Sequence, residues 1–141
     1  MKAKSTNQII PLQDIQSTHM DTLHNLSLRF TANDNLPRAL DLITEAGAYY
    51  EQRAQARNGL YPKFAWILLS QGVLLCAAGR HKEGIEARRK LTDIQERLRA
   101  VFPSLAHCVQ LKLDREMSRP SWIALVAKLD LHCNHQDLHE G

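Results

Sequence analysis

The chain has 141 residues, of which 44% are hydrophobic, and it carries a formal net charge of +3. This length and composition predict one globular domain and exclude a chain that is disordered throughout. Leu and Ala dominate the apolar residues, and they favour helices, because β-branched and aromatic side chains are the ones that fit pleated strands. The three cysteines are widely spaced and odd in number, which favours a reducing, cytoplasmic compartment.

Six helices are predicted in chain order. Residues 1–11 are expected to form a flexible arm that ends at Pro11, and apolar residues then follow helical spacing over about 13–30. The sequence "TANDN" ends this first helix. A second helix begins near Asn35, which we expect to cap it, has Pro37 in its first turn and ends at "NG" (58–59).

The third helix is predicted from Pro62 to Ala78, and because its apolar residues lie on every side, we expect it to be central and buried. A fourth helix extends over about 81–101, a fifth over about 104–117, and a sixth begins near Pro120. No segment alternates as a strand does. The sequence therefore predicts an all-α domain over residues 12–133, built of about six helices in antiparallel hairpins, followed by a polar, His-rich tail over 134–141.

Membrane insertion and secretion are not expected. The longest apolar stretch, "FAWILLSQGVLLCAAG" (64–79), is interrupted by Ser70 and Gln71 and is shorter than the roughly 20 residues that a membrane-spanning helix needs. The sequence "MKAKSTNQIIPLQ" lacks the apolar core and the small-residue cleavage site of a secretory signal.

A spacing of small residues marks the turn between the third and fourth helices. Gly72 is followed seven positions later by Gly79, then by the acidic Glu83 and the aliphatic Ile85. This pattern, over about residues 64–98, resembles the turn of a tetratricopeptide repeat, in which small residues let two helices approach closely and the turn Gly takes a positive φ. The resemblance implies a scaffold that binds a protein or peptide without catalysis. The alternative is an ordinary orthogonal bundle of helices.

Catalytic motifs are missing. The stretch "GRHKEG" has neither the spacing of a phosphate-binding loop nor a strand before it, and neither G-x-S-x-G nor H-E-x-x-H occurs. Asp21 and His24 have a spacing similar to that of the Glu-x-x-His pairs of di-iron bundles, but one such pair does not build a site. We therefore expect a protein that is not an enzyme and has no cofactor.

The tail contains candidate metal ligands. His132, His135 and His139 would share one helix face beside Cys133, and imidazole and thiolate both bind zinc. The alternative, which we favour, is a solvated polar tail without a metal.

The fourth helix is predicted to be basic. Residues 80–99 contain seven Lys or Arg and four acidic residues. One interpretation is a solvated helix with the intrahelical pairs Glu86–Lys90 and Asp93–Arg97. The others are a docking surface for an acidic protein partner and a surface that contacts nucleic-acid phosphates.

We expect a non-catalytic protein–protein interaction module, such as an adaptor, a small regulator or a chaperone. A groove between hairpins would bind a partner segment, with the basic helix providing charge complementarity and buried aromatic anchors providing affinity. We expect Trp66, Trp122, Tyr49 and Tyr50 to be core residues for the most part, and the alternative is that they mark a ligand groove. The candidate partner-binding residues are Tyr49, Arg88, Arg89, Lys90, Arg97 and Arg99. The alternative is a nucleic-acid-binding transcriptional regulator that uses the same basic residues. Apolar stripes on the second and fourth helices would also suit a homodimer.

Overall fold

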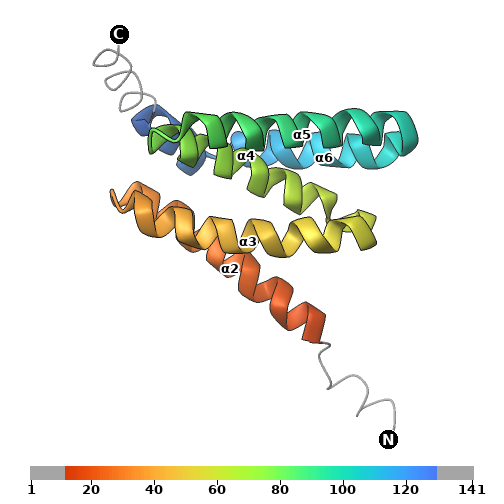
Figure 1. Ribbon diagram of the computed structural model, residues 1–141, viewed down its shortest axis with the longest axis horizontal. Helices are drawn as coiled ribbons and strands as arrows, with labels where there is room; N and C mark the ends of the chain where they lie inside the picture. Colours follow the sequence, from red (N-terminus) through yellow and green to blue (C-terminus); the bar gives the residue numbers. More distant parts are fainter. Residues whose placement is uncertain (1–11, 130–141) are drawn as a thin grey trace, which may run out of the picture.

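The computed structural model describes residues 12–129, and this part of the chain is helical and has no strand, as Figure 1 shows. The helices are α2 (Leu12–Ala32), α3 (Leu36–Ala56), α4 (Tyr61–Ala77), α5 (His81–Val101) and α6 (Pro103–Met117), with a short 3-10 turn, η1 (Asn58–Leu60), before α4. A last helical segment covers Pro120–Leu129. The predicted all-α fold is confirmed. The arm (1–11), the tail (134–141) and the candidate ligands His132, His135 and His139 lie outside the described residues.

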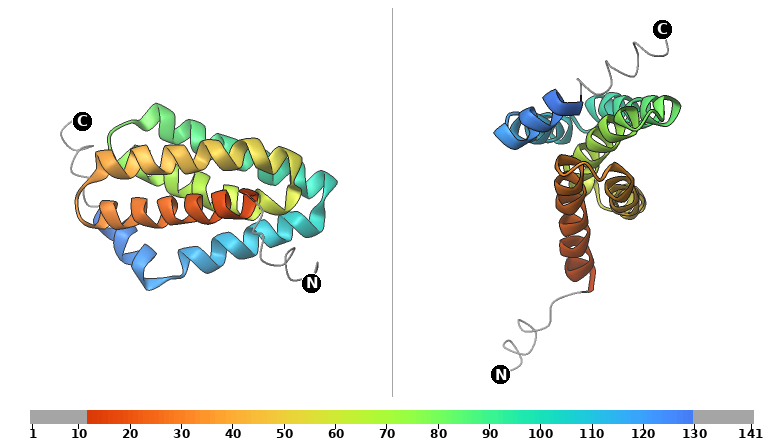
Figure 2. Two further views of the ribbon diagram at one scale, coloured as in Figure 1. Left: turned by 90° about the horizontal axis from the view of Figure 1, so that it is seen from below. Right: turned by 90° about the vertical axis from the view of Figure 1, so that its left-hand side faces the viewer.

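Helix α4 lies at the centre of the fold. It packs against α3 on one side and against α5 and α6 on the other, while α2 packs mainly on α3. Figure 2 shows the resulting layers, with α5 and α6 above α4, and α2 and α3 below it. Each connection between successive helices is short, so neighbours form antiparallel hairpins, as the sequence predicted.

The apolar composition of α4 explains its central place. Its buried residues are Phe64, Ala65, Trp66, Ile67, Leu68, Ser70, Gly72, Leu74, Leu75 and Ala77. By length and composition alone, the segment Asn58–Ala77 would qualify as a membrane-spanning helix. The prediction that no apolar stretch reaches about 20 residues was wrong, because the predicted stretch began at Phe64, whereas the apolar helical segment of 20 residues begins at Asn58. More than half of this apolar stretch is buried inside the protein, as is expected of a core helix.

Small residues bring α4 and α5 close together. A Cβ added to Gly84 would lie 2.6 Å from Sγ of Cys76 and 3.1 Å from the carbonyl oxygen of Gly72. Gly79, in the turn between the two helices, has a φ of 80°. The predicted close approach and the predicted positive φ at Gly79 are both confirmed, because only a residue without Cβ fits these positions without strain.

Two details of α3 differ from the prediction. Asn35 is at the N-cap position, but its side chain makes no capping hydrogen bond. The helix ends at Ala56, before "NG", because Arg57 is extended and Asn58–Leu60 forms the 3-10 turn. Gly59 therefore does not act as a left-handed helix cap. Among the described residues other than glycine, only Asp34 has a positive φ.

Candidate functional site

A groove runs between α2 and α6 over the surface of α4. It consists of two adjoining hollows of about 220 Å³ and about 410 Å³, which share Asn25, Trp66, Glu116 and Arg119. We call it the α2–α6 groove. It is lined by Asp21, His24, Asn25, Leu28, Arg29 and Ala32 of α2, by Lys63, Trp66 and Ile67 of α4, and by Lys112, Glu116, Arg119, Ser121, Trp122 and Leu125 of α6 and the segment after it.

The groove is open because its walls belong to different layers. Helix α2 packs mainly on α3, whereas α6 packs on α4 and α5, so α4 separates the walls and forms the floor. At one end, Nζ of Lys128 donates a hydrogen bond of 2.8 Å to the carbonyl oxygen of Ala32 and lies 2.8 Å from a carboxylate oxygen of Asp34. These contacts tie the segment Pro120–Leu129 to the end of α2.

An ion pair and a hydrogen bond connect the middle of α2 to the core. Nζ of Lys63 lies 2.9 Å from Oδ2 of Asp21, and the hydroxyl of Tyr50 donates a 2.8 Å hydrogen bond to Oδ1. Asp21 thus joins α2 to both α3 and α4. Because the Lys63 and Asp21 side chains are each more than 40% exposed, their ion pair contributes little to stability.

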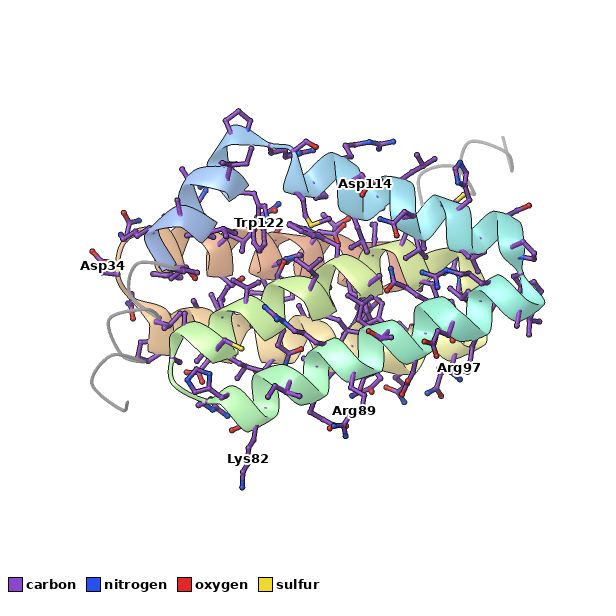
Figure 3. All side chains as sticks on the ribbon, turned by 90° about the horizontal axis from the view of Figure 1, so that it is seen from above. Asp34, Lys82, Arg89, Arg97, Asp114 and Trp122 are labelled. Atoms are coloured by element: carbon purple, nitrogen blue, oxygen red, sulfur yellow. The ribbon has the colours of Figure 1, made fainter. Side chains whose placement is uncertain are left out.

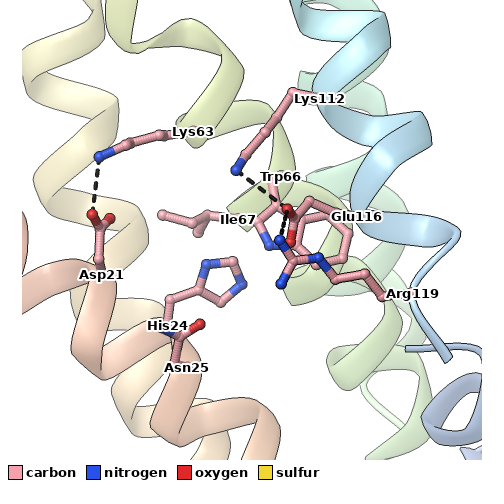
Figure 4. A pocket seen from close by; sticks show the side chains of 9 residues that line it. All are labelled: Asp21, His24, Asn25, Lys63, Trp66, Ile67, Lys112, Glu116 and Arg119. Atoms are coloured by element: carbon pink, nitrogen blue, oxygen red, sulfur yellow. Dashed lines mark hydrogen bonds and ion pairs between the residues drawn. The ribbon is translucent and has the colours of Figure 1, made fainter. Parts of the chain in front are cut away.

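The wall formed by α6 carries one carboxylate between two cations. Oε1 of Glu116 lies 3.4 Å from Nζ of Lys112 and 3.2 Å from a terminal guanidinium nitrogen of Arg119, as Figure 4 shows. Glu116 is only 8% exposed, whereas the Arg119 side chain is 61% exposed. Glu116 therefore positions both cations on the groove wall while leaving Arg119 accessible to solvent.

Two tryptophans connect the floor to the wall. The rings of Trp66 and Trp122 pack edge to face, with centroids 4.8 Å apart and an angle of 66° between planes. Both side chains are buried, so the prediction that they are core residues is confirmed. Both also line the larger hollow, and they are the only two tryptophans in the chain.

A buried histidine–serine contact lies beneath the groove. Nε2 of His24 is 3.1 Å from Oγ of Ser70, and the Ser70 hydroxyl donates a 2.9 Å hydrogen bond to the carbonyl oxygen of Trp66. Because the hydroxyl has one hydrogen, Nε2 of His24 must be the donor to Oγ. Burial lowers the pKa of His24 from 6.5 to about 4; Asp21 partly opposes this effect and Lys112 adds to it. His24 is therefore neutral at physiological pH.

Asp21, His24 and Ser70 are the residue types of a hydrolase triad, but their arrangement does not provide a nucleophile. Ser70 is completely buried, and its hydroxyl hydrogen is bound to a backbone carbonyl. The two oxygens of Asp21 accept from Tyr50 and Lys63. We interpret the histidine–serine contact as structural, since a nucleophile must reach its substrate.

Metal ligands do not gather in the described part of the chain. No group of three or more His, Cys, Asp or Glu side chains that could hold a metal ion occurs there. The Asp21–His24 pair therefore stays an isolated pair within residues 12–129.

The ion pairs of α5 differ from those predicted. Lys90 reaches across to α3, where its Nζ lies 2.6 Å from Oε1 of Glu51, and Glu86 pairs with Arg89 at 3.2 Å. The predicted pair Glu86–Lys90 was therefore wrong. The predicted pair Asp93–Arg97 does not form either, because the charged atoms of these two residues lie more than 4.0 Å apart.

The candidate basic residues lie on several sides of α5. At 3.6 residues per turn, Lys90 lies on the side toward α3, and Arg88 and Arg99 lie on the opposite flank. The Arg88 stem covers Gly72 of α4, and Arg99 lines a hollow beside α6. Arg89 points away from the core, and Arg97, seven residues after Lys90, lies on the same side of the helix as Lys90. Figure 3 shows Arg89 and Arg97 along the edge of the molecule opposite Trp122.

Tyr49 is not part of this edge. It lies on α3, half-buried, with its ring edge-to-face with Tyr50 and with the Arg53 guanidinium 3.9 Å from its centroid. The structure therefore does not bring Tyr49, Arg88, Arg89, Lys90, Arg97 and Arg99 together in one surface, and the groove receives its charges from other residues.

The charged groove residues were missed by the sequence reasoning because they come from distant parts of the chain. No sequence motif connects Lys63, Lys112 and Arg119. They line the same groove only because α4 and α6 pack against each other. One signal was available. Lys63 is the only charged residue of the otherwise apolar α4, and a lone charge on a core helix must reach solvent or a partner.

Comparison of the chain with protein-family models, with curated proteins and with solved structures finds no match.

Proposed function

We propose that this protein is a non-catalytic interaction module that binds a segment of a partner polypeptide in the α2–α6 groove. The observation that carries this proposal is the continuous groove with a charged end and a partly apolar end. Leu28, Ala32 and Leu125 line the second hollow, whereas Asp21, Lys63 and Lys112 line the first. A peptide that presents both apolar and charged side chains would complement both ends.

The helical hairpins support an adaptor, regulator or chaperone role of this kind. The α4–α5 hairpin has two features of the turn that resembles a tetratricopeptide repeat. Its helices approach closely at glycines, and Gly79 in the turn has a positive φ. In this proposal the groove, rather than the outer edge of α5, binds the partner. The basic residues of α5 would then act at most as a second surface, since Arg89 and Lys90 already pair with carboxylates.

Site-specific crosslinking in the native host tests the proposal. A photoreactive amino acid is placed at Asn25 or at Ser121, which are exposed residues on opposite walls of the groove, and in a matched control at Arg89 on the outer edge of α5. We expect both groove positions to crosslink to one polypeptide after nuclease treatment, and the control position not to do so. Excess unlabelled wild-type protein should compete for this product.

Two results would contradict the proposal. If neither groove position crosslinks to a polypeptide, the groove does not bind a partner segment. If position 89 alone gives a product and nuclease removes it, the nucleic-acid-binding alternative is favoured and α5 becomes the site to study.

A further inference from the structure

We infer that the polypeptide segment bound in the α2–α6 groove is acidic, and that one of its carboxylates binds Arg119 and Lys112 beside Glu116. This inference rests on the proposed function, because it specifies the chemistry of the partner segment at the same site.

The charges that line the groove are unequal. The cations are Arg29, Lys63, Lys112 and Arg119, and the carboxylates are Asp21 and Glu116. The cations exceed the carboxylates by two. Such a surplus in a cleft with low-dielectric walls attracts an anionic ligand more strongly than the same charges on an open surface.

The two walls differ in how far their cations are neutralised. On the α2 side, Lys63 has a carboxylate of its own in Asp21. On the α6 side, Lys112 and Arg119 share a single oxygen of Glu116. A guanidinium has five N–H donors in a fork that suits a carboxylate, so Arg119 retains donors for a second carboxylate. Arg29 is exposed and makes no ion pair with any described residue, which adds to the surplus at the other hollow.

The other side chains of the groove favour a polypeptide over a nucleic acid. Single-stranded nucleic acids bind by stacking bases on exposed aromatic rings, but Trp66 and Trp122 are 6% and 7% exposed and pack on each other. By contrast, the half-buried Leu28 and the exposed Ala32 offer apolar contacts that an aliphatic or aromatic side chain of a peptide can use.

The test is selection of a random peptide library on the folded full chain, followed by titration of the enriched peptides. Binding is measured through the intrinsic fluorescence of Trp66 and Trp122, which both line the larger hollow. We expect the enriched peptides to contain Asp or Glu next to an apolar residue. Replacement of their acidic residues by the amides should weaken binding about tenfold or more.

Variants of the protein locate the contact. We expect Arg119→Gln and Lys112→Gln each to weaken binding of the acidic peptides about tenfold. Glu116→Gln should strengthen it severalfold, because it removes the negative charge that competes for both cations, while the amide oxygen of Gln can still accept hydrogen bonds from them and hold them in place. Arg89→Gln is the matched control, since it removes an exposed Arg from the opposite edge, and it should leave affinity unchanged. Thermal unfolding by circular dichroism verifies that each variant folds.

The possible failures are distinguishable. The enriched peptides could lack acidic residues and still lose binding when Asn25→Phe fills the groove. This result would overturn the inference and leave the proposed function standing. Acidic peptides that bind Arg119→Gln and Lys112→Gln as well as wild type would likewise overturn the inference. If no enriched peptide is sensitive to Asn25→Phe, the proposed function itself fails, and a nucleic-acid oligomer that displaces the peptides would contradict both.

Discussion

Nε2 of His24 on α2 donates a hydrogen bond of 3.1 Å to Oγ of Ser70 on α4, and Ser70 in turn donates to the carbonyl oxygen of Trp66. This chain of buried hydrogen bonds joins the first described helix to the core helix. It does not require a charge on His24. The imidazole also packs against the ring of Trp66, with centroids 5.7 Å apart. The contact therefore anchors one wall of the α2–α6 groove to its floor.

The first prediction concerns the pH dependence of stability. Burial lowers the pKa of His24 in the folded protein to about 4, whereas the unfolded chain has the ordinary value of 6.5. Between these values the unfolded state binds more protons, so stability falls as pH falls from 6.5 toward 4. The loss attributable to His24 should reach about 3 kcal/mol and should not grow at lower pH.

Urea unfolding at a series of pH values measures this effect. The variant His24→Gln should lose this part of the pH dependence, because the amide of Gln does not titrate. His19→Gln is the matched control, since His19 is exposed on the same helix, and it should retain the wild-type profile. A His24→Gln variant with an unchanged profile between pH 6.5 and 4 would disprove the assignment to His24.

The second prediction concerns the close approach of α4 and α5 at Gly84. Gly84→Ala would improve helix propensity by about 1 kcal/mol, but its Cβ would overlap with Sγ of Cys76 and approach the backbone of Gly72. Overpacking of this kind costs about 1–3 kcal/mol, so we expect a net loss of up to about 2 kcal/mol in the free energy of unfolding.

Gly72→Ala is the informative comparison. Its Cβ would meet the flexible Arg88 stem at 3.3 Å, which can move, so we expect a smaller loss than at Gly84. Cys76→Ala should partly rescue Gly84→Ala, because it removes the nearest atom. Chemical denaturation of the single and double variants provides the measurement, and equal effects at the two glycines would contradict the packing described.

The third prediction concerns the turn between these helices. Gly79 has a φ of 80°, and a side chain in this left-handed conformation costs roughly 1–2 kcal/mol. We expect Gly79→Ala to lower the free energy of unfolding by this amount and Gly79→Asn to lower it less, since Asn tolerates this conformation better. Gly59→Ala is the control, because its Cβ would meet nothing within 4 Å. A loss at position 59 as large as at position 79 would argue against the assigned turn.

The fourth prediction concerns the ion pair between Glu51 on α3 and Lys90 on α5. The two charged atoms are 2.6 Å apart, but both side chains are 43% exposed. Solvent screening should limit their coupling to less than about 1 kcal/mol. A double-mutant cycle with Glu51→Gln and Lys90→Gln, at low and high salt, measures it. Coupling well above this limit, or unaffected by salt, would show that the pair is more buried than described.

The sequence determined the helices of this protein with useful accuracy. Helical apolar spacing, the prolines at helix starts and Gly79 located the ends of the third, fourth and fifth predicted helices within one or two residues of those observed. The all-round apolar character of the third predicted helix also identified α4 as the centre of the fold. These features depend on local periodicity and on the backbone preferences of single residues, and both can be read from the sequence without knowing how the helices pack on one another.

Only the tertiary structure decided which charged residues share a surface. Sequence spacing paired Lys90 with Glu86 on its own helix, whereas packing of α5 on α3 brings Lys90 to Glu51. The α2–α6 groove likewise joins Asp21, Lys63 and Glu116, which no spacing rule connects. The physical reason is that local periodicity fixes the face of a helix on which a residue lies, but the neighbour on that face depends on how the helices pack. The candidate binding site depends entirely on that packing.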